Sequence, residues 1–276
     1  STATAWRHGR NLRDAKELNT MIKATPFESI RQHRTDLPAE LEADVRVPTL
    51  IVEHSDHSDL LWALRLTEFF GDAGRQYSYQ PDVQWNDDGC GMLSYADTPV
   101  AEAEANASGT CSCRVRSGEA GLTFEIDVTN QSSEIWPEFW GWLCLIHRWS
   151  RAFQANCELP VGDSGNWVPA SSLAAPLERW LKWCPVSGHA EAMQIGQNQG
   201  TRWQPHIQAT QGAVRAWRMH GGHQQFVQLS SPNAIILGWS HWPCTDLGVH
   251  FGTLEPGQTG RVTGQLEFTQ KSYVPI

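Results

Sequence analysis

Alternation of apolar and polar residues is the clearest pattern along this chain. In residues 122–129, LTFEIDVT, every second residue is apolar, and the same period recurs in residues 261–268. Shorter apolar runs, separated by Gly, Pro, Asn and Asp, follow one another from Val47 onward. This alternation is typical of half-buried antiparallel strands. We therefore expect a mainly β fold, an antiparallel β-sandwich, with Phe124, Ile126, Leu266 and Phe268 buried.

Turn residues indicate where the strands meet. A hairpin is predicted at SDHSD, residues 55–59, because it is flanked by the strand-like runs VPTLIVEH and LLWALRLTEF. A second turn is predicted at NDDG, residues 86–89. CSCRVR reads as a strand whose Cys111, Cys113 and Val115 share one buried face. Residues 158–206 are rich in Pro, Gly, Asn and Gln and are expected to form long loops.

The N-terminal part lacks the alternation. Residues 11–45 are expected to be largely helical, with Thr25 as an N-cap and Pro26 at the first helical position. The predicted organisation is an N-terminal helical arm, residues 1–45, followed by a β-sandwich domain, residues 46–276.

Composition narrows the function classes. The net charge is −9 without a lysine-rich run, which disfavours nucleic acid as a partner. No apolar run reaches the ~18 residues of a membrane span, and the N-terminus has no signal-peptide pattern. Seven cysteines without a CxxC pair indicate free thiols and a cytoplasmic protein, with a periplasmic or secreted mature form as the alternative.

The first candidate site lies in GWLCLIHRWSRAF, residues 141–153. On a strand, Leu143, Leu145, His147, Trp149 and Arg151 share one face. This face changes from aliphatic to His, Trp and Arg, as expected for a strand that runs from the core into a groove. The alternative is a core histidine hydrogen-bonded to a backbone carbonyl, with arginines that reach water.

A second candidate cluster lies in GWSHWPCTDLGVH, residues 238–250. Trp239 and His241 share a strand face, and Pro243 places Asp246 in a loop. Trp242, Asp246 and His250 complete the predicted substrate-binding set with Trp149, Arg151 and Trp239. The predicted catalytic residues are His147 and His241. The alternative is a tryptophan-rich core with one polar end.

EHSDHSD at 53–59 holds metal-ligand residue types, but Ser and Asp also favour turns. Ligands this close in sequence rarely complete a metal site without a distant partner. We therefore expect a turn here, no metal ion in the protein and no cofactor.

Two stretches resemble a known family. LTFEIDVTNQSSEIWPEFWGWLCLIH, 122–147, is similar to a strand, a V-T-N turn and a histidine-ending strand of galactose mutarotase-like (aldose epimerase-like) sandwiches. LEPGQTGRVTGQLEF, 254–268, is similar to their closing turn and last strand. The resemblance implies a β-sandwich that recognises sugars, with His147 at the active-site histidine. Arg148 and Trp149 replace the family's aromatic residue after that histidine.

The function predicted from these observations is a carbohydrate-active protein. It is either a sugar epimerase or a lyase acting on uronates, with histidine acid/base chemistry and an arginine that binds an anionic sugar. The expected partner is a small saccharide or a polysaccharide. The alternatives are a non-catalytic carbohydrate-binding domain and a structural subunit whose tryptophan-rich face forms a homo-oligomer interface.

Overall fold

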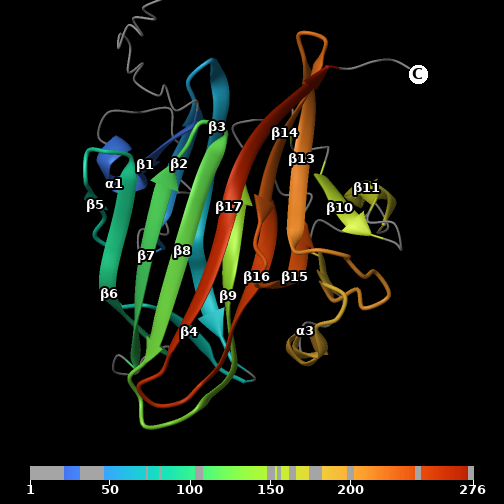
Figure 1. The fold of residues 1–276 in the computed structure, drawn as a ribbon. Coiled ribbons are helices and arrows are strands. Elements are labelled where there is room, and N and C mark those ends of the chain that lie inside the picture. Colours follow the sequence, from blue (N-terminus) through green and yellow to red (C-terminus); the bar gives the residue numbers. More distant parts are fainter. Residues whose placement is uncertain are drawn as a thin grey trace, which may run out of the picture.

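Two arrays of antiparallel strands lie face to face in the computed structural model (Figure 1). The structure describes residues 22–31, 47–72, 74–80, 83–102, 108–147, 153, 157–161, 166–173, 182–197, 202–239 and 244–272. The first array has the order β6 (Met92–Glu102), β7 (Gly109–Ser117), β8 (Gly121–Asn130), β17 (Thr259–Ser272), β14 (His223–Ser230), β13 (Ala213–His220), β10 (Cys157–Val161) and β11 (Asn166–Pro169).

The second array has the order β1 (Ile22–Pro26), β2 (Thr49–His54), β3 (His57–Gly71), β9 (Trp136–Ile146), β16 (Cys244–Leu254), β15 (Ala234–Trp239) and β12 (Lys182–Pro185). Strand β4 (Gln76–Tyr79) pairs with both β3 and β6 and so joins the arrays, while β5 (Asn86–Asp87) pairs with β6. The predicted mainly β, antiparallel sandwich is confirmed.

The main hydrophobic core lies between the two arrays because each strand turns its apolar face inward. The predicted buried residues Phe124, Ile126, Leu266 and Phe268 are all in this core. Cys111, Cys113 and Val115 also share its buried face. The hairpins predicted around SDHSD and NDDG form between β2 and β3 and between β5 and β6.

The described part of the N-terminal region differs from the prediction. Residues Ile22–Pro26 form strand β1, which pairs with β2, so Thr25 is a strand residue and caps no helix. Helix α1 covers only Phe27–Ile30, with Pro26 at its N-cap and no side-chain capping bond. Pairing with an adjacent sheet edge overrides the local capping signal. The rest of the predicted arm lies outside the described residues.

Residues 158–206 contain more regular structure than the prediction of long loops. The described parts form β10, β11, the 3₁₀ turn η2 (Ala170–Ser172), β12 and helix α3 (Ala190–Gly196). Neither α1 nor α3 has the length and apolar character needed to cross a bilayer, and no other described helix does. The strands of this region are four or five residues long, which explains why their alternation was not recognised.

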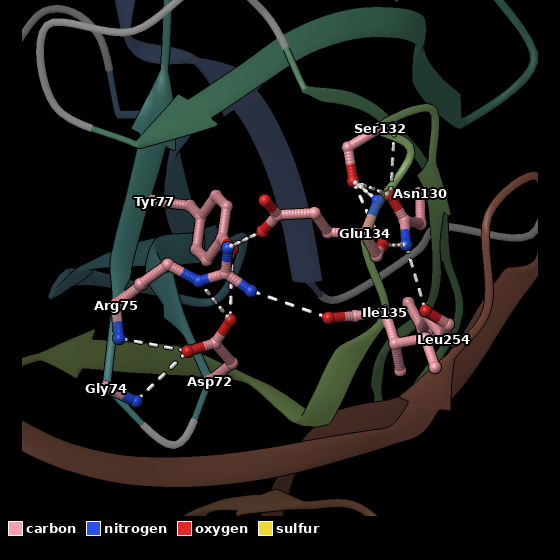
Figure 2. A network of polar contacts seen from close by, with 9 residues as sticks. All are labelled: Asp72, Gly74, Arg75, Tyr77, Asn130, Ser132, Glu134, Ile135 and Leu254. Atoms are coloured by element: carbon pink, nitrogen blue, oxygen red, sulfur yellow. Dashed lines mark hydrogen bonds and ion pairs between the residues drawn. The ribbon is translucent and has the colours of Figure 1, made fainter.

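One end of the sandwich is held by a network around Asn130, the last residue of β8 (Figure 2). The Asn130 Nδ2 donates to the carbonyl oxygens of Glu134 and Leu254 at 2.7 and 2.9 Å, while its Oδ1 accepts from Ser132. Arg75 Nη1 adds an ion pair to Glu134 Oε2 at 2.7 Å. These contacts fix the segment that leads into β9 and bring residues 122–147 against the start of 254–268.

Candidate functional site

The face of the second array that points away from the main core carries most of the polar chemistry of its central strands. We call it the outer face. Along β3, β9 and β16 it has a polar group at one end, an aromatic band in the middle and a histidine–carboxylate pair at the other end. The residues concerned are Arg65, Glu68, Cys144, Cys244 and Asp246; Phe69, Trp140 and Trp142; and His250 with Glu138.

The aromatic band is a second, smaller hydrophobic core. The Trp142 ring lies over Gly238 and Gly248 of the neighbouring strands, where an added Cβ would come within 2.9 and 3.2 Å of it. Its centroid is 4.6 Å from that of Trp183 on β12. Ala192 and Ile195 of α3 complete the cluster. Because Trp142 and Trp183 are buried, they serve packing and do not present a free ring to a ligand.

His250 and Glu138 form a pair on this face. His250 Nε2 lies 2.9 Å from Glu138 Oε2, and both side chains remain partly exposed, at 18% and 32%. Thr253 holds the same carboxylate, because its hydroxyl donates to Glu138 Oε1 at 3.2 Å. The Thr253 hydroxyl also accepts from the Glu138 backbone N–H at 3.3 Å. The threonine therefore fixes one carboxylate beside the imidazole, although His250 Nε2 does not have hydrogen-bond geometry to it.

The backbone at Glu138 is irregular in a way that aims this carboxylate. The register between β9 and β16 shifts on both sides of Gly252, so a bulge separates the pairs His250–Trp140 and Leu254–Trp136. Glu138 lies within this irregular stretch with a φ of 47°. Left-handed backbone at a non-glycine residue is uncommon and costs about 1–3 kcal/mol. Bulges recur beside active sites, where they redirect a side chain.

The polar group at the other end lies in one row across three strands. Arg65 of β3 is opposite Cys144 of β9, and Cys144 is opposite Asp246 of β16. Arg65 forms an ion pair with Glu68. Cys244, two residues before Asp246 on the same strand, places its Sγ 3.4 Å from Asp246 Oδ2. The row brings two thiols and a carboxyl group together beside an arginine.

The row is buried, and burial changes its acid–base properties. Asp246 is 1% exposed, and desolvation raises the pKa of its carboxyl group to about 7. A hydrogen bond with Cys244, together with burial, raises the pKa of the Cys144 thiol well above its usual range. Asp246 Oδ1 has no hydrogen-bond partner among the described residues.

His147 does not face a groove, and this part of the prediction is corrected. Strand β9 ends at Ile146, and the His147 side chain is 2% exposed. Its Nε2 lies 2.9 Å from Thr245 Oγ1, and burial lowers the pKa of the imidazole to about 3. The alternation placed it on the same face as Leu143 and Leu145, but that face is the main core. His147 therefore matches the alternative of a buried histidine, although its partner is the Thr245 hydroxyl and not a backbone carbonyl.

The other predicted site residues have different outcomes. Trp239 ends β15 and is packed in the main core, at 6% exposure. Asp246 was expected in a loop but lies in strand β16, which begins at Cys244, directly after Pro243 in the sequence. His250 is on the outer face, as described above. Trp149, Arg151, His241 and Trp242 lie outside the described residues.

The HSDHSD stretch forms a hairpin turn, as predicted. Ser55 and Asp56 connect β2 to β3, and the Asp56 backbone N–H donates to His54 Nδ1 at 3.1 Å. His57 Nε2 lies 3.0 Å from Gln225 Nε2 of β14. Burial, followed by the charge of a neighbouring histidine or of Arg218, lowers the pKa of both His54 and His57. Among the described residues, the one set of three potential metal ligands is elsewhere, at Cys144, Cys244 and Asp246.

Sequence reasoning missed Arg65, Glu138, Cys144 and Cys244. The sequence holds a signal for the two cysteines. The C-x-D spacing at 244–246 places Cys244 on the same strand face as Asp246. Cys144 follows Trp142 with the same spacing. Only the register of β9 against β16 brings the two strands' residues together.

No protein-family model matches this chain, and no curated protein matches it. Solved structures similar to it include galactose mutarotase-like proteins. One, from Lactobacillus casei ATCC 334, has 12% identity, covers 82% of this chain and 95% of that chain, and gives a TM-score of 0.44. Another, from Clostridium acetobutylicum, has 10% identity with coverages of 83% and 94% and a TM-score of 0.37. A galactose mutarotase related enzyme from Lactobacillus acidophilus has 8% identity, coverages of 83% and 96%, and a TM-score of 0.36. At these identities and TM-scores, the site and its chemistry stand on the residues of this chain alone.

Proposed function

We propose that this chain is a carbohydrate-active protein of the aldose-epimerase type, in which His250 moves a proton on a sugar. The observation that carries the proposal is the 2.9 Å contact between His250 Nε2 and Glu138 Oε2 on a partly exposed face. A histidine held by a carboxylate is a common arrangement for general acid–base catalysis. Glu138 lies beside Nε2, which leaves Nδ1 of His250 to take or return the proton.

The sugar as substrate class rests on the resemblance of residues 122–147 and 254–268 to galactose mutarotase-like sandwiches. Glu138 lies within the first of these stretches, and His250 lies four residues before the second. Asn130 joins the two stretches by its bond to the Leu254 carbonyl. The pair is therefore at the junction of both stretches.

The proposed reaction is the interconversion of the two anomers of an aldose. His250 removes the proton of the anomeric hydroxyl, and the electrons of that O–H bond form the carbonyl. The bond from C1 to the ring oxygen breaks, and the ring oxygen takes a proton from water. After rotation of the open-chain aldehyde, the ring hydroxyl attacks the other carbonyl face and gives its proton back to the hydroxide left by that water. His250 returns its proton to the former carbonyl oxygen, which gives the second anomer.

The test is a panel of aldoses and uronic acids, assayed for binding and for turnover with wild-type protein and three variants. His250→Gln is expected to lower turnover by about 10²–10⁴-fold, because general acid–base catalysis contributes this much. Glu138→Gln is expected to lower turnover as well, since the amide removes the charge that orients the imidazole. His223→Gln, on the β13–β14 hairpin, is the matched control and should retain full activity.

Two outcomes contradict the proposal. The first is sugar binding by wild-type protein without turnover, which would favour a carbohydrate-binding domain. The second is turnover that His250→Gln leaves unchanged. Thermal unfolding of each variant shows whether a lost activity reflects a lost fold.

A further inference from the structure

We propose that Cys144, Cys244 and Asp246 form a zinc site, which we call the Cys–Asp site. It goes beyond the proposed function, because it lies at the opposite end of the outer face from the His250–Glu138 pair. One ligand atom from each residue lies within 4.8 Å of the other two. Thiolates and carboxylates are ligands that zinc takes in proteins, and the combination of two sulfurs with one oxygen favours this borderline-soft ion over magnesium or calcium.

The spacing of the three ligand atoms fits one tetrahedral ion. Zinc–sulfur bonds of about 2.3 Å and zinc–oxygen bonds of about 2.0 Å require ligand atoms about 3.5–3.8 Å apart. Cys244 Sγ and Asp246 Oδ2 are already 3.4 Å apart. The remaining separations, all within 4.8 Å, need adjustments of about 1 Å at most, which side-chain rotation can supply.

The backbone holds these ligands on rigid elements. Cys244 and Asp246 share one face of β16, and Cys144 is directly opposite Asp246 on the paired strand β9. On the other side, Gly238 of β15 is opposite Asp246. A Cβ on Gly238 would lie 3.1 Å from the Asp246 Cβ and 2.9 Å from the Trp142 ring. The absence of a side chain there makes room for the Asp246 Cβ and the Trp142 ring.

A second, independent observation points to a ligand. Asp246 is 1% exposed, the donors beside its carboxyl group are the thiols of Cys144 and Cys244, and its Oδ1 lacks a partner with hydrogen-bond geometry among the described residues. A buried acceptor without a partner costs about 1–3 kcal/mol, so native structures rarely retain one without a reason. A bound cation satisfies this carboxyl group.

Zinc would offset most of the negative charge of the Cys–Asp site. Two thiolates and one carboxylate carry three negative charges, and Zn²⁺ reduces the sum to one. Arg65, opposite Cys144 in the adjacent strand β3, forms an ion pair with Glu68. The remaining negative charge therefore lies beside an arginine whose own charge is offset by Glu68. Three protein ligands leave the fourth tetrahedral position for water or for a ligand of the site.

The experiment measures zinc and cobalt binding by chelator-treated, reduced wild-type protein. We expect one equivalent of Zn²⁺ to bind, and Co²⁺ to give the near-ultraviolet absorption of thiolate-to-cobalt charge transfer. Cys144→Ser and Cys244→Ser should each weaken zinc binding by at least about 100-fold, which exceeds the usual 10–100-fold cost of losing an outer-shell partner. Cys90→Ser removes an exposed thiol elsewhere and is the matched control that should bind as wild type.

Two results would overturn the Cys–Asp site. One is wild-type protein that takes up no zinc at one equivalent, and the other is unchanged affinity in both cysteine variants. If the variants do not fold, X-ray absorption of zinc-loaded wild-type protein decides the matter instead. Two sulfur ligands per zinc support the site, and any other sulfur number contradicts it. Zinc affinity in His250→Gln should equal that of wild type, so the zinc site and the proposed sugar chemistry succeed or fail separately.

Discussion

The buried His147 should make the protein's stability depend on pH in a predictable direction. Burial lowers the pKa of its imidazole from 6.5 to about 3 in the folded state. Between these two values the unfolded chain binds the proton and the folded protein does not. Stability from this residue is therefore complete above pH ~6.5 and is lost as the pH falls toward 3. At pH 4 the free energy of unfolding is lower by about 3 kcal/mol, because the folded protein keeps the imidazole neutral at a pH where the unfolded chain protonates it.

The variant that tests this is His147→Gln, which keeps a hydrogen-bonding side chain near Thr245 Oγ1 but does not titrate. At pH 7 the change should cost about 1–3 kcal/mol, the usual effect of disturbing a buried hydrogen bond. Urea unfolding in the presence of a chelator, at pH 7 and at pH 4, gives the free energies of unfolding. Relative to the variant, wild type should lose about 3 kcal/mol between the two values.

Taking the difference between wild type and His147→Gln cancels the other titrating groups, including His54 and His57. An exposed histidine, His206, provides the control, and His206→Gln should follow wild type at both pH values. A wild-type-minus-variant difference that stays constant within about 0.5 kcal/mol would refute the reasoning, because it would mean that His147 titrates alike in the folded and unfolded states.

Three further predictions concern packing and polar contacts. Phe124→Ala should lower the free energy of unfolding by about 3–5 kcal/mol in a urea titration, because the ring is buried between the arrays, and a loss below 1 kcal/mol would contradict that burial. Asn130→Ala should cost about 1–3 kcal/mol in the same assay, because it leaves the Leu254 carbonyl without this donor, whereas Ser132→Ala should cost less. Gly264→Ala should lower the thermal midpoint, because an added Cβ overlaps the Phe124 ring, and an unchanged midpoint would show that the ring moves aside freely.

The period of two along the strands predicted which faces are buried. Phe124, Leu143 and Leu145 all lie in the main core, as the alternation requires. The same rule placed His147 on the core face. Whether that face opens into a groove at His147 depends on where the strand ends, which the alternation does not show. Strand β9 ends at Ile146, and sequence patterns locate strand ends poorly because termination depends on the neighbouring strands.

The candidate site could be predicted only in part, since it depends on strand register. His250 was named from the sequence, but nothing local indicates that Glu138 turns toward it. That contact arises from the bulge between β9 and β16, which involves strands about a hundred residues apart in the sequence. Cys144 and Asp246 likewise meet only because β9 and β16 pair in this register. Side-chain alternation fixes the face of a residue, and the partner across the ladder is set by the whole sheet.

The most direct test of the central claim is the rate of anomeric exchange of an aldose, measured by NMR magnetisation transfer with metal-free protein. For at least one aldose of the panel, wild-type protein should exchange the two anomers faster than buffer. His250→Gln, with the fold confirmed by its unfolding curve, should reduce that acceleration by about 10²–10⁴-fold. The account is contradicted if wild-type protein accelerates no aldose in the panel, or if His250→Gln exchanges the anomers as fast as wild type does.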